Sequence, residues 1–477
     1  MLVLSIFLSL GLLLVSILIH YMSISKKNET KYHISSLNGS MGWPFIGETL
    51  SFFKPHRSDS IGTFLQQRVS RYGKVFKSNI CGGKAIVSCD QELNMFILQN
   101  EGKLFTSDYP KAMHDILGQY SLILATGDIH KKLRNVIITF INVTKSKPKF
   151  LHCAENLSIS ILESWKNCQE VEFHKEAKMS TLSVIVNQLL SIKPEDPARL
   201  YVLQDYLSYM KGFISLPIPL PGTAYTNAIK ARKRLSARVM GIIKQREHEE
   251  EEMKKAIREE DFLDVIISNE DLNCEEKVSL VLDILFGGFE TSATLLSLVV
   301  YFLAKSPNLL NELKEEHESI RAKKGEGELL NWKDYQKMEF TQCVMFEALR
   351  CGNIVKMVHR KATHSINYKE YVIPKGCKVF PIFTAVHLDP SLHENPFEFN
   401  PMRWTDKTKM NKKTMAFGGG VRICPGGEIG KLQIAFFLHH LVLSYRWKIK
   451  ADEMPIAHPY VEFKRGMLLE IEPITIS

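Results

Sequence analysis

A lone cysteine, Cys424, lies in the glycine-rich segment FGGGVRICPG, which runs from Phe417 to Gly426. Glycines allow the backbone to come close to a flat, bulky group. A helix is predicted to begin near Glu428, and the unpaired N–H groups at a helix start stabilise a thiolate. Cys424 is therefore expected to be a deprotonated metal ligand or a nucleophile. The alternative is a buried structural cysteine in a glycine-rich turn.

A second pair, Glu347 and Arg350, is spaced to lie on one face of a helix. Such pairs are usually surface ion pairs that add little to stability. Here the preceding turn, FTQCVMF, is apolar, so we expect the pair to be buried. A buried arginine needs further acceptors and a rigid setting.

Two glycines, Gly287 and Gly288, directly precede Phe289, Glu290 and Thr291 within a long apolar pattern. Two glycines inside a helix cost about 2 kcal/mol relative to alanine. A ligand that approaches the helix closely, or a local widening of the helix, would offset that cost. Glu290 and Thr291 would then be placed to relay protons to a bound species. The alternative is a helix–helix crossing at small residues, with Thr291 bonding back to its own helix.

The elements that must position these residues are mostly helical. Residues 275–305 predict one long helix that is apolar on most faces, and 335–350 predict a second. Strand-like segments are short and occur at 74–80, 84–88, 371–373, 377–383 and 460–471. We therefore predict a mainly α fold with a small β-sheet subdomain. The strongest charge run, 247–261, is expected to be a solvated helix or a loop between helices.

The composition excludes several classes of protein. Of the 477 residues, 45% are hydrophobic and 24% are charged, which is too apolar for a disordered chain. The net charge of +9 suits a membrane surface or an acidic partner and does not by itself indicate nucleic acid. The nine cysteines form no CxxC pair and are odd in number, which favours a reducing compartment over a disulfide framework.

The N-terminal residues 2–19 carry no charge and would span about 27 Å as a helix, close to the hydrocarbon thickness of a bilayer. Two lysines follow directly and favour a cytoplasmic location for the rest of the chain. We expect a membrane anchor at 1–22, a linker at 23–44 and one large domain at 45–477. The alternative is a cleaved signal peptide, but no basic residue precedes the apolar run and no small-residue cleavage site follows it.

The three motifs together resemble those of the cytochrome P450 haem-thiolate monooxygenases. The family's cysteine motif is matched by Phe417, Gly420, Arg422, Cys424 and Gly426. Its Glu-x-x-Arg motif is matched by Glu347 and Arg350, and its oxygen-activation motif by Gly288, Glu290 and Thr291. The order and the separations of the motifs also fit. The resemblance covers essentially the whole chain and implies the P450 fold, with a single catalytic domain after an N-terminal transmembrane helix.

The resemblance implies a role for each matched residue. Cys424 is expected to ligate the iron of haem b through its thiolate. Phe417 is expected to pack against the ligand loop, and the N–H groups that follow the cysteine, as at Gly426, to bond the sulfur. The residues expected to hold the haem propionates are Arg422, His130, Arg134 and Arg360. Arg403 is expected to join Glu347 and Arg350 in a structural triad behind the haem. Thr291 and Glu290 are expected to deliver protons during oxygen activation.

The expected partners also follow from the resemblance, because the sequence holds no flavin or nicotinamide fingerprint. Electrons would come from a separate NADPH–cytochrome P450 reductase in the endoplasmic reticulum membrane, and O2 would be the second substrate. Lys131, Lys132, Arg422 and Lys431 are expected near the cysteine side of the haem, where they would steer an acidic reductase surface. The alternative for each lysine is an ordinary solvated side chain. No nucleic-acid partner is expected.

Longer strings resemble the plant steroid hydroxylases of brassinosteroid synthesis, and above all their C-22 hydroxylases. These strings are GGFETSATLLSLVVYFLAKSP, LNWKDYQKMEFTQCV, CGNIVKMVHRKA and FTAVHLDP. Residues 210–225 resemble the family's access lid, and their apolar content suits a rigid sterol. The resemblance implies hydroxylation of a plant sterol at C-22. The residues expected to contact the substrate are Phe213, Phe289, Ile354, Val355 and Met357; the alternative is that each is a core residue.

Two departures from the relatives bear on specificity. Asn38–Met41 stands in place of a Pro-Pro-Gly hinge, and Cys377 stands where the brassinosteroid group usually has tryptophan. Three other functions stay open: oxidation of a triterpenoid or of another steroid position, haem binding without turnover, and a membrane carrier that binds sterol without haem. The intact Thr291, Glu290 and Cys424 argue against haem binding without turnover.

Overall fold

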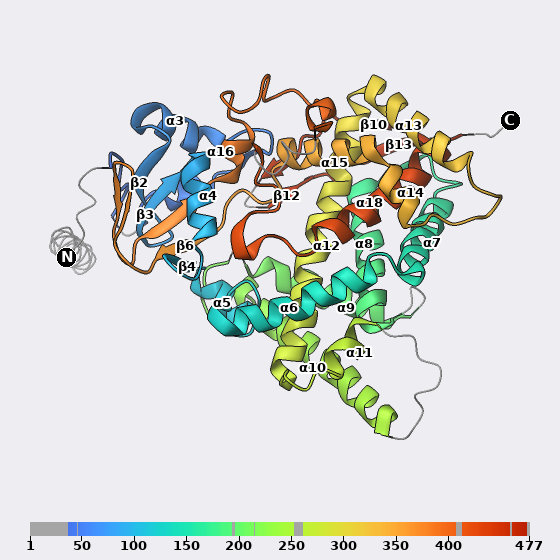
Figure 1. Ribbon diagram of the computed structural model, residues 1–477, viewed down its shortest axis with the longest axis horizontal. Helices are drawn as coiled ribbons and strands as arrows, with labels where there is room; N and C mark the ends of the chain where they lie inside the picture. Colours follow the sequence, from blue (N-terminus) through green and yellow to red (C-terminus); the bar gives the residue numbers. More distant parts are fainter. Residues whose placement is uncertain are drawn as a thin grey trace, which may run out of the picture. The chain divides into compact units, whose positions relative to one another are not determined.

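The computed structural model describes residues 37–44, 46–192, 196–213, 215–251, 261–406, 413–457 and 460–474. The predicted anchor, 1–22, lies outside them, as do 252–260 of the predicted charge run. The chain forms two compact units (Figure 1). The first comprises the residues up to Lys54, 61–108 and 357–382, and the second comprises 55–60, 109–356 and 383–477.

The first unit is built around a five-stranded sheet with the strand order β2-β3-β9-β6-β4. The strands are β2 (Val75–Ile80), β3 (Gly83–Ser88), β9 (Lys378–Pro381), β6 (Arg360–Ala362) and β4 (Phe105–Ser107). The β3–β9 pair is parallel, and the other pairs are antiparallel. Three of the predicted strand segments, 74–80, 84–88 and 377–383, are confirmed in this sheet.

Short helices and a hairpin complete the first unit. The helices are α2 (Thr49–Phe52), α3 (Gly62–Tyr72) and α4 (Gln91–Gln99), and the hairpin is β7 (Ile366–Tyr368) with β8 (Tyr371–Ile373). The Asp90 side chain caps α4 by accepting a hydrogen bond from the N–H of Leu93 at 2.8 Å. The end of the predicted linker pairs with the sheet, because Gly39 forms a parallel bridge with Lys77 of β2.

The second unit is mainly helical. Its helices before the site are α5 (Lys111–Leu117), α6 (Gly127–Thr144), α7 (Pro148–Ser164), α8 (Phe173–Leu190), α9 (Ala198–Lys211), α10 (Ala224–Glu251) and α11 (Phe262–Ile267). They are followed by α12 (Cys274–Ala304), α13 (Pro307–Arg321), α14 (Trp332–Lys337), α15 (Glu339–Gly352), α16 (Phe383–His387) and α18 (Gly427–Ser444). The 3-10 turns η1 (Pro401–Trp404) and η3 (Gly420–Arg422) precede α18.

Two three-stranded sheets belong to the second unit. One has the order β1-β11-β12 (His56–Arg57, Ile456–Ala457, Val461–Glu462) and the other β10-β13-β5 (Tyr445–Ile449, Leu468–Pro473, Glu170–Glu172). The predicted strand 460–471 is therefore two strands, because Gly466 and Met467 take positive φ angles of 78° and 53° between them. The described strands form four small sheets, and helices dominate, so the predicted fold class is confirmed.

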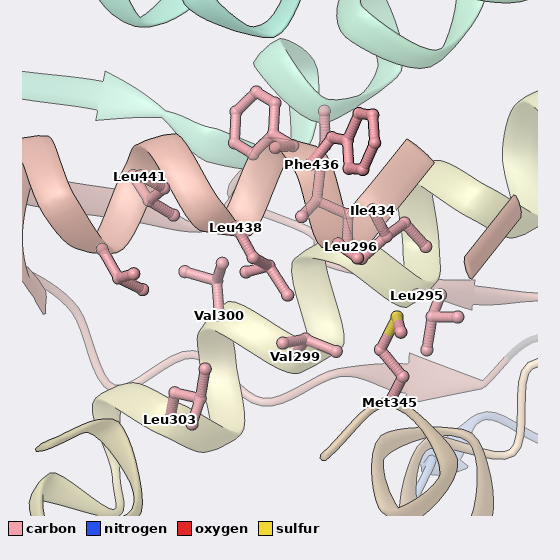
Figure 2. Close-up of a cluster of buried hydrophobic side chains, with 14 of the residues drawn as sticks. Leu295, Leu296, Val299, Val300, Leu303, Met345, Ile434, Phe436, Leu438 and Leu441 are labelled. Carbon is pink, nitrogen blue, oxygen red and sulfur yellow. The ribbon is translucent and has the colours of Figure 1, made fainter. Parts of the chain in front are cut away.

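The long helix α12 confirms the predicted helix 275–305. It begins with a capping box, in which Asn273 and Glu276 each accept a hydrogen bond from the other's backbone N–H. Its C-terminal half packs against α18 and α15 (Figure 2). Leu296, Val299 and Val300 of α12 and Leu438 of α18 belong to this buried cluster. Apolar residues on most faces of α12 are therefore explained by burial.

Among the described residues, α12 is also the one helix long and apolar enough to cross a membrane. In its most apolar stretch, 61% is buried inside the protein, as expected of a core helix. The second predicted helix, 335–350, is wrong in one respect, because it is divided into α14 and α15. The division lies at Met338, whose ψ of 59° is not helical.

Candidate active site

The Cys424 loop lies between η3 and α18 and is held by its own backbone. The N–H of Cys424 donates to the carbonyl of Phe417 at 2.9 Å. The N–H groups of Gly426 and Gly427 bond to the thiol of Cys424. Gly427 must stay small, because a Cβ there would lie 3.0 Å from the ring of Phe417. The predicted helix start near 428 is confirmed, since α18 begins at Gly427.

Several charges and dipoles act on the Cys424 thiol. The residue is exposed, but the protein around it removes enough water to raise the pKa of the thiol. The N–H groups of Gly426 and Gly427 and the charge of Arg134 act to lower that pKa. A transition metal binds the thiolate, so these donors stabilise the form that a metal requires.

The two glycines of α12 have different surroundings. Gly287 is exposed, and a Cβ added there would meet nothing within 4 Å. A Cβ at Gly288 would lie 2.9 Å from Cδ1 of Ile185 on α8. Gly287 therefore opens one face in the middle of α12, whereas Gly288 permits a close helix–helix crossing. The helix-crossing interpretation is confirmed for Gly288, and close approach of a ligand at Gly287 stays a prediction.

The open face of α12 and the Cys424 loop belong to neighbouring elements. A Cβ at Gly430 of α18 would lie 3.2 Å from Oγ of Ser292 on α12. Thr291, next to Ser292, is half-buried, and its hydroxyl donates to the carbonyl of Gly287 at 2.5 Å. The threonine hydroxyl is thus held on the turn of α12 that Gly287 leaves open.

The Glu290 carboxylate is not free. It forms an ion pair with Lys178 of α8 at 2.7 Å, and both side chains are largely buried. No local pattern indicates this partner, because Lys178 lies more than a hundred residues earlier in the chain. Any proton transfer through Glu290 would start from this ion pair.

Two arginines predicted to hold haem propionates donate to backbone carbonyls. Arg422 donates to the carbonyls of Leu122, Ile123 and Ala125 at 3.0, 3.2 and 2.6 Å. Arg134 of α6 donates to the carbonyl of Ile423 at 2.6 Å. His130, one turn earlier on α6, is buried. Arg134 thus connects α6 to the Cys424 loop, and Arg422 connects the start of that loop to residues 122–125.

Arg360 lies in the first unit and has a different environment. It forms a buried ion pair with Glu101 at 2.5 Å, and its Nη1 donates to the carbonyl of His359. The predicted role of Arg360 toward a propionate stays a prediction. Its partner Glu101 was missed, because the pairing depends on how β6 and β4 lie in the sheet.

Glu347 lies at the centre of a buried network. It accepts hydrogen bonds from Arg350 at 2.7 and 2.9 Å, from Arg403 at 3.0 Å and from Nε1 of Trp404 at 2.8 Å. Arg350 also donates to the carbonyls of His387, Pro396 and Glu398. Burial alone would raise the pKa of Glu347, but Arg350, the N–H of Asn400 and the charge of Arg403 together outweigh it and the pKa is lowered.

The side chains of Glu347 and Arg350 are both fully buried, so the predicted burial of this pair is confirmed. Each charged group in the network has the partners that a buried ion pair needs. The structure also brings Arg403 to Glu347, as the resemblance implies. Trp404 was not anticipated, although it directly follows Arg403 in the sequence.

The residues predicted to contact the substrate differ in burial. Phe289 is fully buried, with its ring 4.9 Å from that of Tyr206, and Phe213 is buried against Phe286. Ile354 is half-buried, and Val355 is 43% exposed. Met357 is half-buried in the first unit. The packing of Phe289 is that of a core residue, and the open face of α12 lies at Gly287 instead.

The predicted basic surface is smaller than expected. Lys431 is buried, forms an ion pair with Glu428 at 3.0 Å and lies over the ring of Phe346. Lys132 pairs with Glu276 at 2.7 Å. Lys131 is exposed and has only Asp128, at 3.2 Å, as an ion-pair partner in the described part of the chain. Lys431 therefore cannot contribute to an exposed docking surface.

The sequence of the chain matches a known protein family. The cytochrome P450 family model matches residues 38–476. The chain belongs to the cytochrome P450 family. Its relatives include cytochrome P450 724B1 of Oryza sativa subsp. japonica, which is 48% identical over 98% of this chain and 96% of that protein. The cholesterol 22-monohydroxylase CYP90B52 of Paris polyphylla is 38% identical over 95% of this chain and 96% of that protein.

The P450 fold is also found by structure. Retinoic acid bound cyanobacterial CYP120A1 superposes with a TM-score of 0.80 and covers 92% of this chain and 99% of that one. The sequence identity is 24%, so this likeness concerns the fold. The membership of the cytochrome P450 family that the three motifs predict is confirmed.

A P450 carries a haem whose iron is bound by a cysteine thiolate, and the residues present fit this group. The Cys424 sulfur receives two N–H groups, as a thiolate ligand requires. A Cβ at Gly287 or at Gly426 would meet nothing within 4 Å, so the backbone leaves room for a flat group. When bound, the haem supplies the iron chemistry that activates O2.

Proposed function

We propose that this P450 is a monooxygenase that hydroxylates a plant sterol at side-chain carbon C-22. The reaction consumes one O2, two electrons and two protons, and it yields the hydroxylated sterol and one water. The observation that carries the proposal is the near-full-length similarity to relatives named for this reaction. Besides the Paris polyphylla protein, a steroid (22S)-hydroxylase of Brachypodium distachyon is 38% identical over 91% of this chain.

The site residues divide the work among them. Cys424 would bind the iron, with the N–H groups of Gly426 and Gly427 stabilising the thiolate. His130, Arg134, Arg422 and Arg360 would hold the propionates. A guanidinium has five N–H donors, so Arg134 and Arg422 can bind a propionate carboxylate in addition to their backbone carbonyls. The Glu347 network would keep the framework behind the haem rigid.

Thr291 and Glu290 would manage protons. The Thr291 hydroxyl donates to the carbonyl of Gly287, and its oxygen can still accept a hydrogen bond from a water or a bound species. It is held on the exposed turn of α12, which adjoins α18 at Ser292 and Gly430. Glu290, paired with Lys178, would resupply protons from the α8 side of the helix.

Specificity for C-22 must come from position, because a sterol side chain carries no activated C–H bond at that carbon. Ile354, Val355 and Met357 would line the substrate, together with Phe213 at the start of the predicted lid. In that lid Leu216, Ile218 and Leu220 are exposed, which suits an apolar route to the site. Phe289 would support this wall from the core.

The partners follow from the family. Electrons would come from NADPH through a separate reductase, which would dock near the Cys424 loop. The chain would be held in the endoplasmic reticulum membrane by residues 1–22, with the catalytic part in the cytoplasm.

A second candidate activity is oxidation at C-16 in addition to C-22. It is favoured by one relative, the cholesterol 16,22-dihydroxylase CYP90G4 of Trigonella foenum-graecum, which is 41% identical over 98% of both chains. Both activities would use the same site and would differ in which carbon of the sterol is held at the iron.

Binding spectra test the proposed substrate class. The purified haem-loaded protein is titrated with campesterol, with cholesterol and with a pentacyclic triterpenoid, and NADPH consumption with reductase is followed in parallel. A spin-state change and stimulated NADPH use with the sterols alone would support the proposal. The same response only with the triterpenoid would reject the sterol assignment.

A further inference from the structure

A half-buried carboxylate on α12, that of Asp283, holds a segment that the mechanism above does not use. Asp283 lies one turn before Gly287 and two turns before Thr291, so the three residues share one face of α12. One Asp283 oxygen accepts from the hydroxyl of Ser121 at 2.7 Å, and the other accepts from the N–H of Leu122 at 2.6 Å.

The same segment is held from its other side by the Cys424 loop. We call Ser121–Ala125 the bridging segment. Arg422, two residues before Cys424, donates to the carbonyls of Leu122, Ile123 and Ala125. The N–H of Leu122 is thus bound by α12 and its carbonyl by Arg422 of η3, which directly precedes the Cys424 loop. The bridging segment joins the two halves of the site through one residue.

The apolar side chains of the bridging segment face a hydrophobic cluster of the unit. Leu122 and Ile123 are half-buried and pack against the hydrophobic cluster that contains Phe213 and Phe289. Both phenylalanines were predicted to contact or support the substrate wall. A shift of the bridging segment would therefore move apolar side chains that pack against the same cluster as these two predicted substrate contacts.

The hydrogen bonds of Asp283 do not require a negative charge. Burial raises the pKa of Asp283 to about 7, although Ser121, the Leu122 N–H and the charge of Arg232 on α10 oppose this. The other titratable neighbour is Tyr209 of α9, whose pKa is raised by its own burial. A protonated carboxyl would donate to the Ser121 oxygen and still accept from the Leu122 N–H.

We propose that Asp283 is a positioning residue, which fixes the bridging segment against α12 and thereby sets where the sterol side chain lies. It acts through two hydrogen bonds and not through its charge or as a proton donor. The link to the sterol rests on the proposed function, whereas the link to the bridging segment does not.

The test uses the full-length, haem-loaded protein with the variants Asp283→Asn, Asp283→Leu and Ser121→Ala. Asparagine can donate to Ser121 and accept from Leu122, so it should behave as the wild type. Leucine has a similar volume but leaves the Leu122 N–H without its acceptor. Hydrogen exchange of the peptide that covers 118–126 should be about tenfold faster in Asp283→Leu, and less affected in Ser121→Ala.

Activity gives the second measurement. Asp283→Leu should lower kcat/KM for the sterol about tenfold and spread hydroxylation over neighbouring carbons, while the reduced-CO band keeps its thiolate position. Asp283→Asn should stay within about twofold of the wild type in both respects. The matched control is Glu316→Gln, because Glu316 is also a half-buried acid that accepts from a threonine hydroxyl and from backbone N–H groups. It holds α15, so exchange of 118–126 should not change.

The outcomes separate the claims. If Asp283→Asn loses activity while its 118–126 exchange stays slow, the carboxyl acts as an acid and the positioning role is wrong. If exchange in Asp283→Leu equals that of the wild type, the carboxylate does not hold the bridging segment and the proposal fails. If exchange rises as expected but no sterol is oxidised by any form, the sterol assignment fails and the structural role stands. Should Asp283→Leu not bind haem, Ser121→Ala gives the exchange result.

Discussion

At the scale of single residues, the proposed function depends first on Cys424. Cys424→Ala removes the sole sulfur in the loop that receives the Gly426 and Gly427 N–H groups. We expect the reduced-CO band of thiolate ligation to disappear and sterol oxidation to fall to background. The matched control is Cys343→Ala, a buried cysteine that packs against Trp404. Its CO band should keep the wild-type position. A thiolate band that survives in Cys424→Ala would contradict the ligand assignment.

Thr291 gives a second prediction at this scale. Its hydroxyl is held on the open turn of α12 by the Gly287 carbonyl at 2.5 Å. Thr291→Ala should keep the CO band but lower product per NADPH about tenfold or more, with the lost electrons recovered as peroxide. Thr291→Ser, which retains the hydroxyl, should recover most of the coupling. Equal coupling in all three proteins would mean that the hydroxyl serves only its own helix.

Some of the site residues could be predicted from the sequence. Cys424 and Glu347 could be identified because their motifs are local, with neighbours that limit what the side chain can do. The partners of Glu290 and Arg360 could not, because Lys178 and Glu101 lie far away in the sequence and no local pattern marks them. The one sequence feature that marks Asp283 is its spacing of four residues from Gly287. This spacing places Asp283 on the helix face that also carries Thr291.

At the scale of elements, the two glycines of α12 should respond differently to alanine. Gly287→Ala adds a methyl group to open space, so helix propensity should raise the free energy of unfolding by about 0.5–1 kcal/mol. The new methyl group would also project onto the open face and should reduce turnover. In Gly288→Ala the Cδ1 of Ile185 must move aside, so part of the stabilisation should be lost. Denaturant unfolding compares the two; a larger gain for Gly288→Ala would contradict this.

The Glu347 network predicts a stability effect with a defined pH dependence. Glu347→Gln leaves Arg350 and Arg403 without a buried counter-charge and should destabilise the fold by about 3–5 kcal/mol. The pKa of Glu347 is lowered in the folded protein, so the contribution is complete above the unfolded pKa. It is lost as the pH falls through the folded pKa.

Acid unfolding curves check this pH dependence, since the difference between wild type and Glu347→Gln should shrink at low pH. The control Glu163→Gln removes an exposed pair with Lys166 and should change stability by less than about 1 kcal/mol. A stability difference that is constant with pH would show that Glu347 is not ionised in the folded protein.

Helices could be predicted from the sequence where the apolar pattern continues over many turns. The extent of α12 was predicted to within a residue or two because its apolar pattern runs for about eight turns. The division between α14 and α15 was missed, since nothing in the sequence marks Met338 as a break. The Asn331 cap of α14, with bonds from Lys333 and Asp334, explains why a separate helix starts there.

At the scale of the whole molecule, similarity extends over nearly all of the chain. Cytochrome P450 724B1 aligns with 98% of it, and the P450 family model reaches from 38 to 476. The fold is also shared with CYP120A1 at 24% sequence identity, so the fold tolerates change at most positions. The proposed role of Asp283 assigns the position of oxidation to other residues, among them Leu122 and Ile123.

The most direct test of the central claim is product analysis after turnover with isotopically heavy O2. Microsomes that carry this P450 and a plant reductase are supplied with NADPH and, separately, with campesterol and cholesterol. We predict one main product with a heavy hydroxyl oxygen at C-22, absent without NADPH and absent in Cys424→Ala. A normal reduced-CO band together with no sterol product, or with hydroxylation only at other carbons, would contradict the account.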